Sequence, residues 1–89
     1  MRANVWRLEP GARGRRHLEL VQEELFVVLE GAATLRLGDA PERVELPRGS
    51  ITAVQPLTPL QLIDDGELPA VVLIGGAPPA QGQAEYLPG

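Results

Sequence analysis

The apolar residues of this chain fall into short runs of four to seven residues, and each run ends at a turn-forming segment. No stretch of twelve or more residues keeps the 3.6-residue period of a surface helix. The runs are residues 4–9, 17–21, 24–30, 33–38, 43–46, 50–54, 60–64 and 70–74. Strands at this spacing, separated by glycine and proline, are typical of antiparallel sandwiches and barrels. The sequence therefore predicts an all-β protein, a small antiparallel β-barrel.

A chain of 89 residues is long enough for one domain and too short for two. We expect the barrel to occupy residues 1–76. The Gly- and Pro-rich segment 77–89 is expected to form a C-terminal tail, with Tyr86 and Leu87 as the residues that fix its end. Asp65-Gly66 separates two apolar runs and predicts a β-hairpin, because glycine accepts the positive φ of a type I′ turn.

Composition argues against several classes of function. The net charge is −4, and nucleic-acid binding needs a clustered positive surface, so we expect no nucleic-acid partner. The chain has no cysteine, which excludes disulfides and thiolate metal sites. The longest apolar run, 70–74, is too short to span a bilayer, and the N-terminus lacks the apolar core of a signal peptide. We therefore expect a cytoplasmic protein with no membrane partner.

The run 24–30 is apolar on both faces of the strand that it predicts. Side chains alternate between the two faces of a strand, so Phe26 and Val28 lie on one face and Leu25 and Val27 on the other. A small barrel has only one interior, and the second face needs cover from another sheet layer or another subunit. We therefore expect a homodimer.

The run 17–21 has a polar face and an apolar face. If Leu18 and Leu20 face the core, His17 and Glu19 lie in water. If His17 and Glu19 face a cavity, the leucines lie at a second contact. A shift of one residue in strand register exchanges the two faces, so both interpretations remain open.

One segment of the chain follows the spacing of a known motif. Five residues separate Gly11 from His17, and Glu19 follows two positions later. Four residues separate Glu19 from Glu24, and six more lead to Gly31. This spacing resembles the first motif of the cupin family, with Glu19 in the place of a second histidine. The resemblance implies a jelly-roll barrel, or double-stranded β-helix, with a ligand or metal site inside.

The second cupin motif is present in its spacing but not in its chemistry. With Gly49 as its first residue, Leu57 stands at a glycine position, Leu60 at the metal-binding histidine and Asp64 at an asparagine. An alkyl side chain has no lone pair, and His17 is the chain's only histidine. The three-histidine metal site of the family is therefore incomplete.

The resemblance implies a pocket formed by His17, Glu19, Glu24, Phe26, Leu60 and Leu62. Such a lining suits a small-molecule site, and it equally suits a filled core. Glu24 has alternative structural partners in Arg15, Arg36 and protonated His17. We expect no bound cofactor or metal; the fallback is a divalent ion (Mn, Fe, Ni or Zn) held by His17, Glu19 and Glu24.

The leading hypothesis for function is a stand-alone, degenerate cupin that acts as a metal-independent small-molecule-binding or accessory module. The alternative is a cupin enzyme, an isomerase or lyase acting on a small sugar or carboxylic acid. In that case Glu24 or His17 transfers protons, with or without a weakly bound divalent metal. A third hypothesis is a sensor domain that works with a separate regulatory partner.

Overall fold

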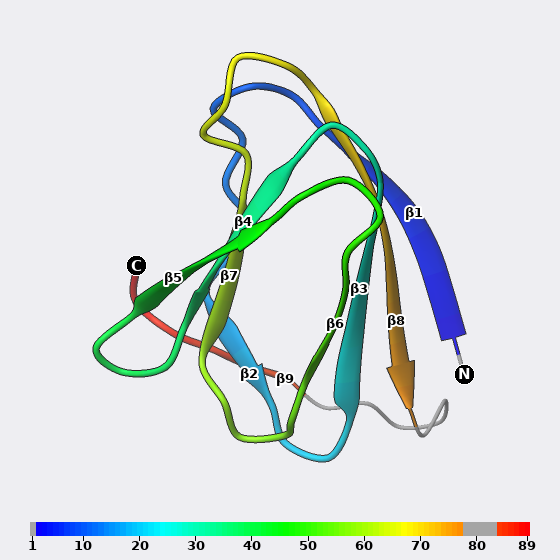
Figure 1. The fold of residues 1–89 in the computed structure, drawn as a ribbon. Coiled ribbons are helices and arrows are strands. Elements are labelled where there is room, and N and C mark those ends of the chain that lie inside the picture. Colours follow the sequence, from blue (N-terminus) through cyan, green and yellow to red (C-terminus); the bar gives the residue numbers. More distant parts are fainter. Residues whose placement is uncertain (1, 78–83) are drawn as a thin grey trace.

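The computed structural model describes residues 2–77 and 84–89, which form two antiparallel β-sheets that face each other (Figure 1). The strands are β1 (Arg2–Leu8), β2 (His17–Glu19), β3 (Glu23–Glu30), β4 (Ala33–Leu37), β5 (Glu42–Leu46), β6 (Ile51–Val54), β7 (Leu60–Ile63), β8 (Ala70–Ala77) and β9 (Ala84–Tyr86). Within the described residues, one sheet has the order β1-β8-β3-β6 and the other β5-β4-β7-β2-β9. In the same ranges, no helix is long and apolar enough to cross a membrane.

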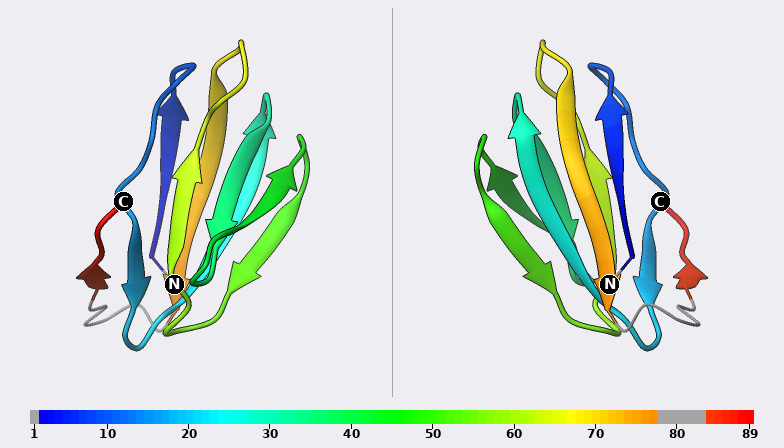
Figure 2. Two further views of the ribbon diagram at one scale, coloured as in Figure 1. Left: turned by 90° about the vertical axis from the view of Figure 1, so that its left-hand side faces the viewer. Right: turned by 90° about the vertical axis from the view of Figure 1, so that its right-hand side faces the viewer.

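The all-β prediction is confirmed, and each of the predicted apolar runs overlaps a strand. The chain crosses repeatedly between the two sheets, as in a double-stranded β-helix. The connections β1–β2 and β7–β8 lie side by side at one end of the molecule (Figures 1 and 2). There the Gly11 N–H donates to the carbonyl oxygen of Asp64 at 2.7 Å.

The core lies between the sheets and is filled by alternate residues of the facing strands. Its buried members are Phe26, Val28, Ala33, Leu35, Leu46, Val54, Leu60, Leu62, Ala70 and Val72. Phe26 and Val28 fix the orientation of β3, because burying them turns every second residue of the strand inward. Glu24 shares their face and therefore also points between the sheets.

The hairpin predicted at Asp65-Gly66 is wrong. β7 pairs with β4 and β2, whereas β8 pairs with β1 and β3, so this segment crosses from one sheet to the other. Gly66 is not among the glycines with positive φ, and its N–H donates to Oδ1 of Asp64 at 3.1 Å. Asp and Gly therefore build a local Asx-type turn here rather than a type I′ turn.

The described end of the predicted C-terminal tail forms a strand. β9 pairs with β2, which sets Tyr86 beside His17. The Leu87 N–H donates to the carbonyl oxygen of Arg16 at 2.8 Å, and the Arg16 guanidinium donates to the carbonyl oxygen of Pro88 at 3.1 Å. Residues 78–83 of the predicted tail lie outside the described residues.

Candidate functional site

His17 lies at the centre of a polar cluster between the sheets. It begins β2 and pairs with Leu60 of β7 on one side. Its Nδ1 lies 3.0 Å from the carbonyl oxygen of Arg15, so Nδ1 carries the proton that this oxygen accepts. Its Nε2 then faces Oε1 of Glu24 at 2.9 Å and Oε2 of Glu19 at 3.3 Å. We call His17, Glu19 and Glu24 the His17 cluster.

The three side chains of the His17 cluster need a proton or a cation between them. A neutral imidazole with its proton on Nδ1 presents a lone pair at Nε2, and this lone pair would repel the two carboxylates. A proton on Nε2, or a cation among the three groups, removes the conflict. The hydrogen bond to Glu24 accordingly raises the pKa of His17, although burial opposes it. Burial, with the nearby Glu24 carboxylate, raises the pKa of Glu19.

All three aromatic residues of the chain line one cavity of about 420 Å³. We call it the aromatic cavity. Trp6, Phe26 and Tyr86 share its lining with His17 and Glu24. The remaining lining residues are Leu8, Arg13, Gly14, Arg15, Leu60, Leu62 and Ile74. The guanidinium of Arg15 lies over the Tyr86 ring, 3.9 Å from its centre, which adds a fixed positive charge.

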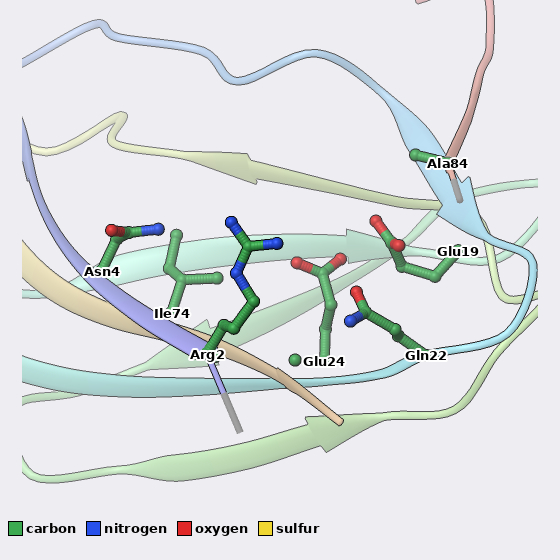
Figure 3. A pocket seen from close by; sticks show the side chains of 9 residues that line it. Arg2, Asn4, Glu19, Gln22, Glu24, Ile74 and Ala84 are labelled. Carbon is green, nitrogen blue, oxygen red and sulfur yellow. The ribbon is translucent and has the colours of Figure 1, made fainter. Parts of the chain in front are cut away.

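A second cavity, of about 270 Å³, shares Glu24 and Ile74 with the aromatic cavity. We call it the polar cavity. Figure 3 shows the carboxylates of Glu19 and Glu24 directed toward the same hollow as the Arg2 guanidinium, with the Gln22 amide beside them. Glu24 therefore lies at the boundary between an apolar space and a polar one.

The structure brings the predicted pocket residues together on these two cavities. His17, Glu24, Phe26, Leu60 and Leu62 line the aromatic cavity, and Glu19 lines the polar one. The sequence analysis missed Trp6 and Tyr86. Trp6 shares a strand face with Leu8, so alternation along β1 could have indicated it. Tyr86 follows no apolar run, and only the rarity of aromatic residues in the chain singles it out.

The donor atoms of the His17 cluster fit a divalent cation. One imidazole nitrogen and two carboxylate oxygens lie within 4.8 Å of one another. An oxygen-rich set of this kind suits Mn²⁺ or Mg²⁺, with water completing the shell. The Nδ1 contact with the Arg15 carbonyl is the kind of outer contact that orients metal-binding histidines. Leu60, at the position of a family histidine, is buried in the core.

Two facing antiparallel sheets with a ligand-sized cavity between them define a double-stranded β-helix protein. The family model for the cupin domain matches residues 4–75. The chain therefore belongs to the cupin family. No curated protein matches it.

Several solved structures share this fold. An uncharacterized conserved protein with a double-stranded β-helix domain from Klebsiella pneumoniae is 20% identical, with a TM-score of 0.87 over 98% of this chain and 74% of that one. A sugar phosphate isomerase from a cupin superfamily, from Silicibacter pomeroyi, is 29% identical, with a TM-score of 0.78 over 96% and 55%. A dTDP sugar isomerase from Desulfovibrio desulfuricans is 20% identical, with a TM-score of 0.83 over 98% and 64%. The chain thus spans only about half to three quarters of these relatives.

Proposed function

We propose that the protein binds a small organic molecule in the aromatic cavity, with the His17 cluster as its polar anchor. The observation that carries the proposal is that the chain's three aromatic side chains and its single histidine all line this cavity. Trp6 is 54% exposed and Tyr86 55% exposed, so neither side chain is part of the buried core. Half-exposed aromatic rings beside a few polar groups are the usual composition of a ligand site.

A binding experiment with defined probes tests this proposal. Glucose, glucose 6-phosphate and citrate are added separately to isotope-labelled protein, and the NMR signals of the Trp6 indole and the His17 ring are followed. We expect at least one probe to move both signals, and Trp6→Ala to weaken its binding by about tenfold or more. Val5→Ala, on the opposite face of β1, is the control and should bind normally. Equal affinity in both variants, or no shift with any probe, would reject the proposal.

We also propose that this binding does not depend on a metal, because the His17 cluster lacks the further histidines of the family's site. Equilibrium dialysis of the purified protein against Mn²⁺, Fe²⁺, Ni²⁺ and Zn²⁺ is expected to leave no stoichiometric metal. Stoichiometric binding that Glu24→Gln abolishes would overturn this part of the proposal. The cluster would then hold an ion that acts as a Lewis acid toward a ligand oxygen.

A second candidate function is isomerisation of a small sugar or sugar phosphate. The hydrogen bond between His17 and Glu24 inside a ligand-sized cavity favours it. So does the likeness to the Silicibacter protein named as a sugar phosphate isomerase. In an aldose–ketose exchange, Glu24 takes a proton from the carbon beside the carbonyl and returns it to the neighbouring carbon. His17, whose pKa is raised by its hydrogen bond to Glu24, exchanges a proton with the two oxygens.

Isomerisation is tested by deuterium exchange. Glucose 6-phosphate or fructose 6-phosphate is incubated with the protein in heavy water, and NMR follows deuterium at the carbon next to the carbonyl. The isomerase function predicts exchange that falls by about a hundredfold or more in Glu24→Gln and His17→Gln. Glu23→Gln is the matched control, because the Glu23 side chain is exposed and accepts a hydrogen bond from the Gln55 amide. Binding without exchange would leave the binding function and remove this candidate.

A further inference from the structure

The outer face of the five-stranded sheet carries a cavity of about 390 Å³ lined by three arginines. We call it the arginine cavity. Leu35 of β4 is buried in the core, so its neighbours in the strand, Thr34 and Arg36, point outward. Arg36 pairs directly with Arg43 of β5 in the antiparallel register. Two like charges at directly opposite positions of a sheet repel each other.

The third arginine, Arg13, comes from the connection between β1 and β2. This connection runs alongside β7 and pairs with its last residues. The Gly14 N–H donates to the carbonyl oxygen of Leu62 at 2.8 Å, and Arg13 forms an isolated antiparallel bridge with Ile63. Arg13 therefore lies beside Ile63 on the outer face, across β7 from Thr34, which is two residues from Arg36 in β4. Ile63 is only 5% exposed and lines the cavity together with the two arginines.

The charges around the arginine cavity are unevenly paired. Asp65 binds Arg43 through two hydrogen bonds of 2.5 and 3.0 Å, and Glu45 binds the same guanidinium at 2.6 Å. Both nearby exposed carboxylates are thus committed to one arginine. Asp64 also lines the cavity and is 1% exposed; one of its oxygens accepts the Gly66 N–H, and the other has no hydrogen-bond partner among the described residues.

Arg13 and Arg36 remain without a partner. Across residues 2–77 and 84–89, neither guanidinium has a hydrogen bond or an ion pair. Each offers a planar fork of N–H donors, which matches the oxygens of a phosphate group. Two unpaired positive charges also match the two negative charges that a phosphate monoester carries near neutral pH.

We propose that the arginine cavity binds the phosphate group of a small phosphate monoester, held by Arg13 and Arg36. Arg43 lies at the rim, where Asp65 and Glu45 bind its guanidinium and neutralise its charge. The volume exceeds the needs of one phosphate group, which leaves room for the organic part of the ester. This site is separate from the His17 cluster and shares only Arg13 with the aromatic cavity, so it is independent of the function proposed above.

The proposal is tested with inorganic phosphate and glycerol 3-phosphate as probes. Isothermal titration gives the affinity, and amide NMR shifts locate the site. We expect shifts at Gly11, Arg13 and Ile63, and tighter binding of the ester than of inorganic phosphate. Replacing both arginines, as Arg13→Gln with Arg36→Gln, should weaken binding by about tenfold or more, because each removes charge-assisted hydrogen bonds.

Arg7→Gln with Arg48→Gln is the matched control, since it removes two positive charges from exposed positions outside the cavity. It should change the affinity by less than about twofold, as expected for a distant screened charge. Equal weakening in the Arg7/Arg48 control and in the Arg13/Arg36 variant would mean a general charge effect and would overturn the proposal. Shifts confined to Trp6 and His17 would also overturn it, because the probe would then lie between the sheets. If inorganic phosphate binds as tightly as the ester, the site recognises free phosphate and the ester claim falls.

Discussion

At the scale of single residues, the two nitrogens of His17 have different tasks. Nδ1 is committed to the carbonyl oxygen of Arg15, and this contact aims Nε2 at Glu24 and Glu19. The imidazole is therefore oriented by the backbone before any ligand or ion arrives. Its charge then depends on pH, because the second nitrogen is the one that gains or loses a proton.

The first prediction concerns this pH dependence. The folded-state pKa of His17 lies above its ordinary value of about 6.5, so its stabilising contribution is complete below that pH. The contribution is lost as the pH rises through the folded-state pKa. Urea unfolding should therefore show wild type more stable than His17→Gln near pH 5.5, by about 1–2 kcal/mol, with a smaller difference near pH 9. If the stability difference between wild type and His17→Gln grew with pH, His17 would not be stabilised by a proton on Nε2.

Leu57 is the one described residue other than glycine with a positive φ, at 68°. In the cupin spacing it stands where the family has a glycine, so the backbone keeps the glycine conformation although the side chain has changed. Its N–H still donates to the carbonyl oxygen of Glu19 at 2.7 Å, which holds the turn in place. The side chain therefore sits on a strained backbone.

The second prediction is that Leu57→Gly stabilises the protein. The left-handed conformation costs a non-glycine residue about 1–2 kcal/mol. Glycine gives the unfolded chain more conformational entropy, which offsets roughly 0.5–1 kcal/mol of that gain. We expect a net gain of about 0.5–1 kcal/mol in the free energy of unfolding, measured by urea titration. Leu68→Gly, at another exposed leucine without positive φ, should give no gain. A loss of stability in Leu57→Gly would show that the backbone at Leu57 is not strained.

Some of the site could be predicted from single residues and some could not. The cupin-like spacing of His17, Glu19 and Glu24 implied that they share a pocket, although strand alternation alone left the face of His17 and Glu19 open. Spacing does not reveal that Tyr86, near the far end of the chain, closes the same cavity. That contact depends on the long-range pairing of β9 with β2, for which the local sequence has no pattern.

At the scale of elements, the turn between β3 and β4 controls how the two sheets approach each other. Gly31 has a φ of 70°, and a Cβ atom there would lie 2.3 Å from the carbonyl oxygen of Pro69. The contact joins this turn to the connection that leads into β8. Gly31 closes the first cupin motif, so the motif spacing includes a steric requirement of the fold as well as the positions of ligands.

The third prediction compares two glycines with similar φ. Gly31→Ala should destabilise the protein by about 2–5 kcal/mol, because conformational strain and overpacking add. Gly49→Ala has the same conformational strain, but its Cβ would meet nothing within 4 Å, so we expect a loss of only about 1–2 kcal/mol. Urea unfolding of both variants gives the comparison. Equal losses would show that the close approach at Pro69 is unimportant.

The positions of the strands could be predicted from the sequence, but their pairing could be predicted less well. Each apolar run became a strand because its alternation and flanking turns act locally. The Asp65-Gly66 segment shows the limit, since the same turn residues can serve a hairpin or a crossing between sheets. Which one forms depends on where β8 buries Ala70 and Val72, and that is decided by the other strands.

At the scale of the whole molecule, the outer face of the four-stranded sheet is apolar. The register aligns Val5, Leu73, Val27 and Ile51 in one row across its strands. Val5 is 60% exposed and Ile51 70% exposed, whereas the two central residues are half-buried. Contiguous apolar patches of this kind are typical of interaction surfaces. The homodimer predicted from the two-sided run 24–30 thus has a candidate interface.

The fourth prediction is that the protein is a dimer joined through this row. Light scattering at micromolar concentration should give twice the mass of the chain. Ile51→Asp should shift the mass toward that of a monomer, because burying an unpaired charge in the interface is costly. Leu68→Asp, at an equally exposed leucine in the connection between β7 and β8, should leave the mass unchanged. A monomeric mass for the wild type would remove the dimer.

The gathering of Trp6, Tyr86 and Phe26 on one cavity has a practical consequence for spectroscopy. The intrinsic fluorescence of the whole chain originates at the wall of that cavity, since no other indole or phenol exists in it. A compound that enters between the sheets will quench or shift the emission without any added label. A compound bound in the arginine cavity, which no aromatic residue lines, is expected to leave the emission unchanged. Intrinsic fluorescence can therefore distinguish binding at the aromatic cavity from binding at the arginine cavity.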